Sequence, residues 1–299
     1  MALIMVSFFM WLNLDRSHPA AMNPSSQKEI KEKETKEEPK RTVHIKRKDG
    51  STAEVELEAY LVGVVASEMG ADFPLEALKA QAVASRTFVA QRQFVVDDTV
   101  ASQVYQDDSQ LLAVWGTNYD EKRAKVAEAV AQTKGEVLRY RGELITAAFF
   151  SSCAGATNNS EDYWKSAVPY LRSVESPWDQ NIEGYAQEVS FTDAQLAELL
   201  GFQQPIQTIG KPQRYDNGYV KSVTIDGIKF SGREIREALS LRSSAFTITV
   251  KKDQIIFTTQ GFGHGIGMSQ YGAAAMANEG SDYKKILKHY YQGIEITAL

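Results

Sequence analysis

The sequence contains few of the side chains that build metal sites and disulfide frameworks. It has one cysteine, Cys153, and four histidines among its 299 residues. A single cysteine cannot form an internal disulfide, and alone it cannot build a zinc site. No histidine has another four residues away, and no H-E-x-x-H motif occurs, so these metal-site patterns are excluded. We therefore expect no metal and no cofactor, while the low cysteine content leaves the cellular compartment open.

The chain also lacks an excess of positive charge. It carries 33 Lys and Arg against 38 Asp and Glu, a net charge of -5. This balance argues against a general nucleic-acid or anionic-membrane surface, so no nucleic-acid partner is expected. With 43% hydrophobic and 24% charged residues, the composition is that of a globular protein. The length is sufficient for a sizeable core, in one large domain or two small ones.

The apolar run at the start of the chain is too short to cross a bilayer as a helix. Residues 1–14 read MALIMVSFFMWLNL, whereas a spanning helix needs about 20 residues. The run has neither a basic region nor an A-x-A cleavage site, so it is a poor signal peptide. A buried helix is the alternative. We favour the distal part of a membrane anchor whose first residues are missing or misassigned, because the run leads directly into a linker.

That linker is a charged tether over residues 15–41. Its second half, residues 28–41, carries six positive and five negative side chains and almost no apolar ones. Such a segment cannot bury a core and stays solvated. An apolar start, a charged tether and a folded body over residues 42–299 together indicate a single-pass anchor in the cell membrane with an extracytoplasmic domain.

Helical and strand patterns are mixed along the folded body, which predicts an α+β fold. Helical periodicity covers residues 58–69, 74–93 and 121–133, and a short helix is expected over residues 192–201. Alternating segments flank turn signals at residues 49–50, 141–142 and 226–227, and strands are expected over residues 246–250 and 255–259. Helices and antiparallel hairpins intermix without a regular strand-helix repeat, which is typical of the α+β class.

A glycine-rich stretch from Gly261 to Gly280 resembles a nucleotide or nucleophile loop but matches neither. Five glycines fall in its first twelve residues, with His264 between two of them. It fails the G-x-G-x-x-G spacing, it has no lysine for a phosphate loop, and Tyr271 replaces the last glycine of G-x-S-x-G. The glycines allow backbone conformations that side chains forbid. Their purpose is therefore neither to bind a nucleotide nor to present a nucleophile.

Glu68 is the carboxylate with the most unusual surroundings in the sequence. Its neighbours in VVASEM, residues 64–69, are otherwise apolar or small. Apolar walls disfavour the charged form, so the pKa of Glu68 should rise, as a general acid at neutral pH requires. The alternative is a glutamate at a helix end that faces solvent.

Three further side chains have both a functional and a structural interpretation. Arg86 could bind a sugar or carboxylate group, pair with a buried carboxylate, or lie on a helix surface. His264 could be a base, a ligand, a substrate contact or a structural hydrogen-bond bridge. Cys153 could be a nucleophile partnered by His264, or a small buried hydrophobic residue, which is the more frequent case. Aromatic residues in loop-like segments, such as Trp164, could stack on sugars or pack in the core.

Five segments in order resemble the stage II sporulation protein D/LytB family. They are YLVGVVASEM (60–69), FPLEALKAQAVASRT (73–87), SQVY (102–105), AFFSSCAGAT (148–157) and the glycine stretch over 261–272. The similarity extends over nearly all of residues 42–299. It implies a membrane-anchored lytic transglycosylase that cleaves peptidoglycan between N-acetylmuramic acid and N-acetylglucosamine, preferably in strands without stem peptides, during engulfment of the forespore. It also implies stage II sporulation proteins P and M as partners.

The resemblance also implies site residues within one extended substrate groove. The catalytic glutamate of the family falls on Glu68, and an important arginine falls on Arg86. From the family segments and the aromatic residues we expect substrate contacts from Arg86, Gln81, Tyr105, Ser152, Trp164, His264, Ser269, Gln270 and Tyr271. A lytic transglycosylase can work with one carboxyl, whereas a hydrolytic glycosidase usually needs two.

The sequence departs from the family at one point, and the family also offers an alternative function. Some members of the family hold zinc near the segment that corresponds to residues 151–157, but here that segment has Cys153 and no histidine, so no structural zinc is predicted. The family also includes non-catalytic wall-binding proteins that stimulate an amidase, and this is the alternative function.

Overall fold

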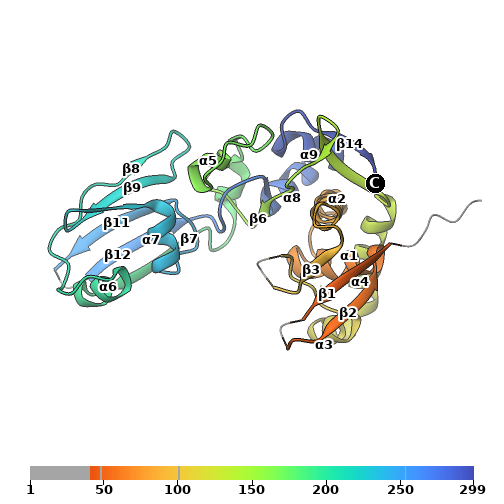
Figure 1. The fold of residues 1–299 in the computed structure, drawn as a ribbon, viewed down its shortest axis with the longest axis horizontal. Coiled ribbons are helices and arrows are strands. Elements are labelled where there is room, and N and C mark those ends of the chain that lie inside the picture. Colours follow the sequence, from red (N-terminus) through yellow and green to blue (C-terminus); the bar gives the residue numbers. More distant parts are fainter. Residues whose placement is uncertain (1–40, 48, 100–101, 253) are drawn as a thin grey trace, which may run out of the picture. The chain divides into compact units, whose positions relative to one another are not determined.

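The described part of the chain mixes helices with several small sheets, so the predicted α+β class is confirmed (Figure 1). The computed structural model describes residues 41–47, 49–99, 102–252 and 254–299. Lys40–Leu299 is one compact unit. The expected anchor, and the expected linker apart from Arg41, lie outside the described residues. Within the described ranges, no helix is both long enough and apolar enough to cross a membrane.

The described chain begins with a small sheet of three strands in the order β2-β1-β3. β1 (Thr42–Lys46) and β2 (Thr52–Glu56) form the predicted antiparallel hairpin. Gly50 lies in its turn with φ +85°, a conformation that favours glycine. β3 (Val95–Asp97) pairs with β1 in parallel. The predicted antiparallel hairpins did not include this parallel pair. The two strands are distant in sequence, and local alternation carries no signal for such a pairing.

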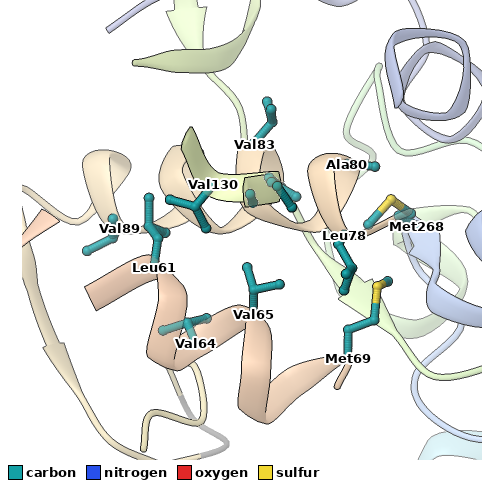
Figure 2. Packing of buried hydrophobic residues seen from close by; sticks show 14 of the residues in the cluster. Leu61, Val64, Val65, Met69, Leu78, Ala80, Val83, Val89, Val130 and Met268 are labelled. Carbon is teal, nitrogen blue, oxygen red and sulfur yellow. The ribbon is translucent and has the colours of Figure 1, made fainter. Parts of the chain in front are cut away.

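Four helices follow the hairpin and build the larger core. They are α1 (Leu57–Glu68), α2 (Leu75–Gln91), α3 (Asp108–Trp115) and α4 (Tyr119–Gln132). The predicted helices over residues 58–69, 74–93 and 121–133 are thus confirmed within a few residues. α1 is buried along most of its length, although Ala59 is exposed, which fits a helix of high overall hydrophobicity. Figure 2 shows its Leu61 and Val65 on the side that faces α2 and Val130 of α4, within the same hydrophobic cluster.

The middle and the end of the chain return to this core. β4 (Glu136–Tyr140) and β5 (Glu143–Leu144) form the predicted strand pair, and β14 (Glu295–Ala298) joins β4. β6 (Phe149–Phe150) pairs in parallel with β13 (Met268–Ser269). The helices of this region are α5 (Ser160–Tyr163), η2 (Pro177–Asn181), α8 (Gln270–Asn278) and α9 (Tyr283–Tyr290), and η1 (Gly116–Asn118) precedes α4.

A second hydrophobic cluster forms among two antiparallel sheets of three strands. The first has the order β11-β12-β7, and the second β10-β9-β8 (Figure 1). The strands are β7 (Ala186–Phe191), β11 (Phe246–Lys251), β12 (Gln254–Gln260), β8 (Gln213–Arg214), β9 (Val220–Ile225) and β10 (Ile228–Ser231). α6 (Asp193–Leu200) and α7 (Gly232–Ala238) contribute Leu196 and Ile235 to the cluster. The hairpin predicted at residues 226–227 and the strands predicted over 246–259 are confirmed.

Candidate functional site

The last residue of α1, Glu68, sits where the larger core meets a pocket. Most of α1 is buried, and Tyr60, Leu61, Val64 and Val65 are fully so, which anchors the helix end. The segment after β3 runs along α1: Tyr105 stacks on Tyr60 with ring centroids 5.2 Å apart. A Cβ on Gly63 would lie 2.6 Å from the Tyr105 ring, so glycine permits this approach. As a result the backbone N–H of Val104 donates to Glu68 Oε1 at 2.6 Å.

The surroundings of Glu68 favour its neutral form. Burial raises the pKa of the carboxyl, and the hydrogen bond from Val104 opposes this shift only in part. Glu68 also ends a helix, where the negative end of the helix dipole disfavours a carboxylate. The predicted direction of the pKa shift is thus confirmed. Because Val104 donates to Oε1, the acidic proton belongs on Oε2.

The pocket beside Glu68 has a volume of about 840 Å³. Among its described lining residues Glu68 is the only carboxylate, and Arg92 and Arg236 are the only cations apart from the titratable His264. The remaining polar lining is neutral, and several aromatic rings complete the walls. The lining residues are Glu68, Met69, Phe73, Phe88, Gln91, Arg92, Ser102, Thr146, Ala148, Phe149, Phe150, Ser151, Trp164, Arg236, Phe262, Gly263, His264, Gln270 and Tyr271.

The glycine-rich stretch forms a wall of the same pocket through residues 262–264 and 270–271. Its glycines serve close packing against the segment around β6. A Cβ on Gly267 would lie 2.0 Å from the Ala148 carbonyl oxygen, and one on Gly263 would lie 2.7 Å from Phe150 Cβ. Both glycines have positive φ, +79° and +122°. Two of the segments that carry the family resemblance are therefore neighbours in space.

His264 is a fixed, neutral imidazole in this wall. Its Nδ1 accepts a hydrogen bond from the Ile266 N–H at 3.0 Å, and its carbonyl accepts one from Asn158 Nδ2 at 3.0 Å. Burial, assisted by the positive charge of Arg236, lowers its pKa to about 4. The structural hydrogen-bond bridge foreseen for this residue is present. The occupied Nδ1 and the low pKa argue against a general base.

Gln270 connects the glycine-rich wall to the end of α1. Its Nε2 donates to the Glu68 carbonyl oxygen at 3.0 Å and approaches Gln81 Oε1 at 3.4 Å. Gln81 is fully buried behind Gln270 and also donates to Ser85 Oγ at 3.1 Å. Gln270 therefore lines the pocket, whereas Gln81 supports it and does not line it. The expectation of a direct substrate contact from Gln81 is corrected accordingly.

Two of the expected stacking rings do line the pocket. Tyr271 is exposed and packs edge-on against Phe73 with ring centroids 5.1 Å apart. Trp164 is half-buried, with its ring centroid 5.8 Å from that of His264. Tyr105 does not line the pocket: it is buried, and its ring is engaged by Tyr60. Its expected substrate contact is therefore corrected.

Arg86 is a buried structural residue rather than a pocket residue. It is fully buried, and its Nε and Nη2 donate to the two carboxylate oxygens of Glu58 at 3.0 and 2.6 Å. Its other bonds reach the carbonyl oxygens of Glu136 and Val130 at 3.1 and 3.3 Å. The guanidinium thus has no free face toward the pocket, which corrects the expected substrate contact. The alternative, pairing with a carboxylate, is the arrangement found, and the carboxylate of Glu58 is half-buried.

Ser152 and Ser269 also lie behind the wall and not on it. Ser152 is buried, and its backbone is bridged to Phe262. Ser269 Oγ accepts from the Gly272 N–H at the start of α8 and donates to Asp179 Oδ2 at 2.7 Å. Their expected substrate contacts are corrected because their hydroxyl or backbone groups hold the wall together.

Cys153 belongs to a buried polar cluster that sequence patterns did not indicate. Its N–H donates to Asp179 Oδ2 at 2.6 Å, and its Sγ lies 3.6 Å from the Ser176 carbonyl oxygen. Burial and the nearby Asp179 raise the pKa of the thiol far above its usual range. Cys153 is fully buried and does not line the pocket, so the Cys153/His264 hydrolase is not supported. The structural interpretation of Cys153 is confirmed.

Several further residues line the pocket that no sequence pattern indicated, and two of them are cations. Arg92 follows α2, and Arg236 lies on α7. In sequence each reads as a charged residue at a helix surface, so no local signal could have selected them. Phe88 and Phe262 were missed because a single aromatic residue predicts only packing.

These features define a class: an α+β protein whose polar and aromatic pocket contains one partly desolvated carboxyl group among its described lining. A family model described as "Stage II sporulation protein" matches residues 46–140. Stage II sporulation protein D of Bacillus subtilis (strain 168) is 45% identical over 260 residues, which cover 83% of this chain and 76% of that protein. The protein of the same name from Bacillus amyloliquefaciens is 44% identical over 260 residues, which again cover 83% of this chain and 76% of that protein.

A further relative, named amidase enhancer, comes from Bacillus subtilis (strain 168). It is 34% identical over 299 residues, which cover 80% of this chain and 40% of that protein. At these levels of identity and coverage, the chain belongs to the family of stage II sporulation protein D.

Proposed function

We propose that the protein is a lytic transglycosylase acting on peptidoglycan glycan strands, with Glu68 as its single acid and base. The observation that carries the proposal is the setting of Glu68. Its carboxyl opens into the pocket and has a raised pKa, and the other described lining residues include no second carboxylate. A general acid at neutral pH needs such a raised pKa. A hydrolytic glycosidase normally needs a second carboxyl group to activate water or to form a covalent intermediate.

The reaction needs only one group that gives and then takes a proton. Glu68 donates its Oε2 proton to the glycosidic oxygen as the bond to C1 of N-acetylmuramic acid breaks. The carboxylate that results accepts the proton of the C6 hydroxyl of the same sugar. The C6 oxygen then bonds to C1 and closes a 1,6-anhydro ring, so no water is consumed and Glu68 returns to its acid form.

The composition of the pocket suits a sugar polymer. Its volume of about 840 Å³ lies within the range of about 300–1,000 Å³ typical of ligand pockets. Trp164 and Tyr271 offer ring faces, and Gln270 and Ser102 offer neutral hydrogen-bonding groups. Sugar rings are recognised by this combination of stacking and neutral hydrogen bonds.

The biological setting is proposed from the family. Relatives named stage II sporulation protein D support a role in sporulation, which we place at engulfment of the forespore. There the protein would act outside the cytoplasm from a membrane anchor. Its substrate would be strands stripped of stem peptides, and its partners stage II sporulation proteins P and M.

Replacement of Glu68 by glutamine tests the assignment. Glu68→Gln keeps the shape of the side chain and removes its titrating proton. Denuded glycan strands are incubated with the purified protein, and mass spectrometry detects fragments with 1,6-anhydro ends. We expect wild type and Glu198→Gln, a matched carboxyl-to-amide change at an exposed position of α6, to release them. Release by Glu68→Gln at the wild-type rate would refute the assignment.

A non-catalytic protein that stimulates an amidase is the second candidate. The observation that favours it is the relative named amidase enhancer, at 34% identity. The two candidates separate when the protein is incubated with denuded glycan and no amidase. Anhydro-ended fragments support the transglycosylase, whereas intact glycan, together with a faster amidase when both proteins are mixed, supports the second candidate.

A further inference from the structure

Arg236 is a cation of the pocket that lacks a carboxylate partner among the described residues. It lies on α7, where its Nη1 donates to Tyr163 Oη at 2.5 Å and its Nε to the Arg242 carbonyl oxygen at 3.3 Å. Both acceptors are uncharged. Arg233, one turn earlier on the same helix, pairs with Glu237 at 2.8 Å. Within the described residues, none of the hydrogen bonds of Arg236 brings a negative charge to it at the pocket wall.

The surroundings of Arg236 also favour the binding of an anion. The side chain is half-buried, so water screens its charge less than at an open surface. His264 lies close enough for the charge of Arg236 to lower its pKa, and it stays neutral. Glu68 is the one carboxylate among the described lining residues, and its described hydrogen bond is with Val104, not with Arg236. The free protein therefore presents a positive subsite at Arg236.

The other arginine of the pocket is less suited to hold a ligand. The guanidinium of Arg92 lies 3.7 Å from the ring centroid of Phe88, and the side chain is exposed. Its charge also acts on Asp97, whose pKa it helps to lower. Arg92 thus acts on a nearby carboxylate, whereas the described hydrogen bonds of Arg236 go to uncharged acceptors.

We propose that Arg236 binds the free lactyl carboxylate of a muramic acid residue that has lost its stem peptide. This inference rests on the proposed function and adds the source of its substrate preference. When the stem peptide is present, the lactyl carbonyl is part of an amide and has no charge. When an amidase has removed the peptide, the lactyl group ends in a carboxylate, which a guanidinium binds through charge-assisted hydrogen bonds. Trp164 and His264 at the same wall would contact the sugar that carries it.

The test measures binding in the Glu68→Gln protein, so that cleavage does not interfere. One ligand is a glycan fragment with free lactyl carboxylates. The other is the same fragment after carbodiimide coupling to methylamine, which turns each carboxylate into a neutral amide. Calorimetry should show that the carboxylate form binds about ten- to a hundredfold more tightly, the range for one charge-assisted contact. Equal affinity for the two forms overturns the proposal without any change at Arg236.

Substitutions then assign the preference to Arg236. Arg236→Gln in the Glu68→Gln background should abolish the preference and leave binding of the amide form unchanged, whereas Arg236→Lys should keep part of it. Arg233→Gln is the matched control on the same helix and should keep all of it. Persistence of the preference in Arg236→Gln, or equal weakening of both ligands, overturns the proposal. If Arg236→Gln does not fold, the control still tests the proposal. A folded Arg233→Gln protein that no longer prefers the carboxylate ligand would contradict the role of Arg236.

This experiment and the test of the proposed function fail independently. A protein that yields no anhydro fragments but prefers the carboxylate ligand through Arg236 retains the anion subsite as a binding site and loses the enzyme assignment. A protein that cleaves glycan without this preference retains the enzyme assignment and loses the role of Arg236.

Discussion

Replacing Arg86 with methionine should destabilise the fold and leave glycan binding intact. The fully buried guanidinium donates to both carboxylate oxygens of Glu58, at 3.0 and 2.6 Å, and to two carbonyl oxygens. Methionine fills much of the same volume and leaves the Glu58 carboxylate, whose side chain is 19% exposed, without its partner. Breaking one half of a buried ion pair costs about 3–5 kcal/mol. For a chain of this size, the melting temperature should fall by roughly 2–4 °C per kcal/mol.

Thermal denaturation followed by circular dichroism measures this loss, and a second substitution tests its cause. Adding Glu58→Met to Arg86→Met removes the stranded charge and should recover a large part of the lost stability. Glycan affinity, measured at a temperature where both variants are folded, should stay within about twofold of the wild-type value. Our account of Arg86 is wrong if Arg86→Met melts with the wild type, or if the folded variant has lost its affinity for glycan.

Three further predictions follow from individual groups. The folded-state pKa of Glu68 lies above its ordinary value of 4.5. Ionisation of Glu68 therefore lowers the stability of the folded protein when the pH rises above that value, and it has no effect on stability at lower pH. Glu68→Gln should therefore melt higher than wild type at neutral pH, and the difference should vanish in acid; a constant difference across pH would contradict this. Cys153 should react with iodoacetamide only after unfolding, and Cys153→Ala should keep full turnover; fast labelling of the folded protein would contradict its burial. Gly267→Ala should lose about 1–3 kcal/mol more in the free energy of unfolding than Gly280→Ala, because both have positive φ but only Gly267 has a carbonyl oxygen 2.0 Å from the added Cβ; equal losses in urea titrations would refute the clash.

Local signals in the sequence predicted the hairpins and the helices α1, α2, α4 and α6, but not α3, α5, α8 or α9. Thr192 and Gly201 mark the two ends of α6, where the Thr192 side chain accepts from Gln195 N–H and Gly201 is left-handed. The turn at residues 226–227 placed β9 and β10 in the observed register. These features depend on neighbours in the chain, which a sequence displays directly.

The pairing of segments that are distant in the chain could not be predicted from local sequence signals. β6 and β13 pair in parallel over more than a hundred residues of chain, with only two residues in each strand. Arg86 and Arg236 both lie on helices, yet Arg86 forms an ion pair with Glu58, whereas Arg236 lines the pocket. Periodicity marks the inner face of a helix, but it does not show which partner covers that face. The setting of Glu68 could be anticipated because its apolar neighbours are adjacent in sequence.

The glycine-rich stretch acts on the pocket through the backbone, and its order along the chain explains how. Gly267 allows the backbone to approach the Ala148 carbonyl, and the next two residues pair with β6. Ser269 then caps α8, so Gln270 begins this helix and its amide reaches the Glu68 carbonyl oxygen. Each step depends on the one before it, because a displaced backbone at Gly267 would shift the strand, the cap and the amide together. The glycines therefore place the wall of the pocket relative to Glu68, and Gly263 also lines the pocket itself beside the polar side chains of that wall.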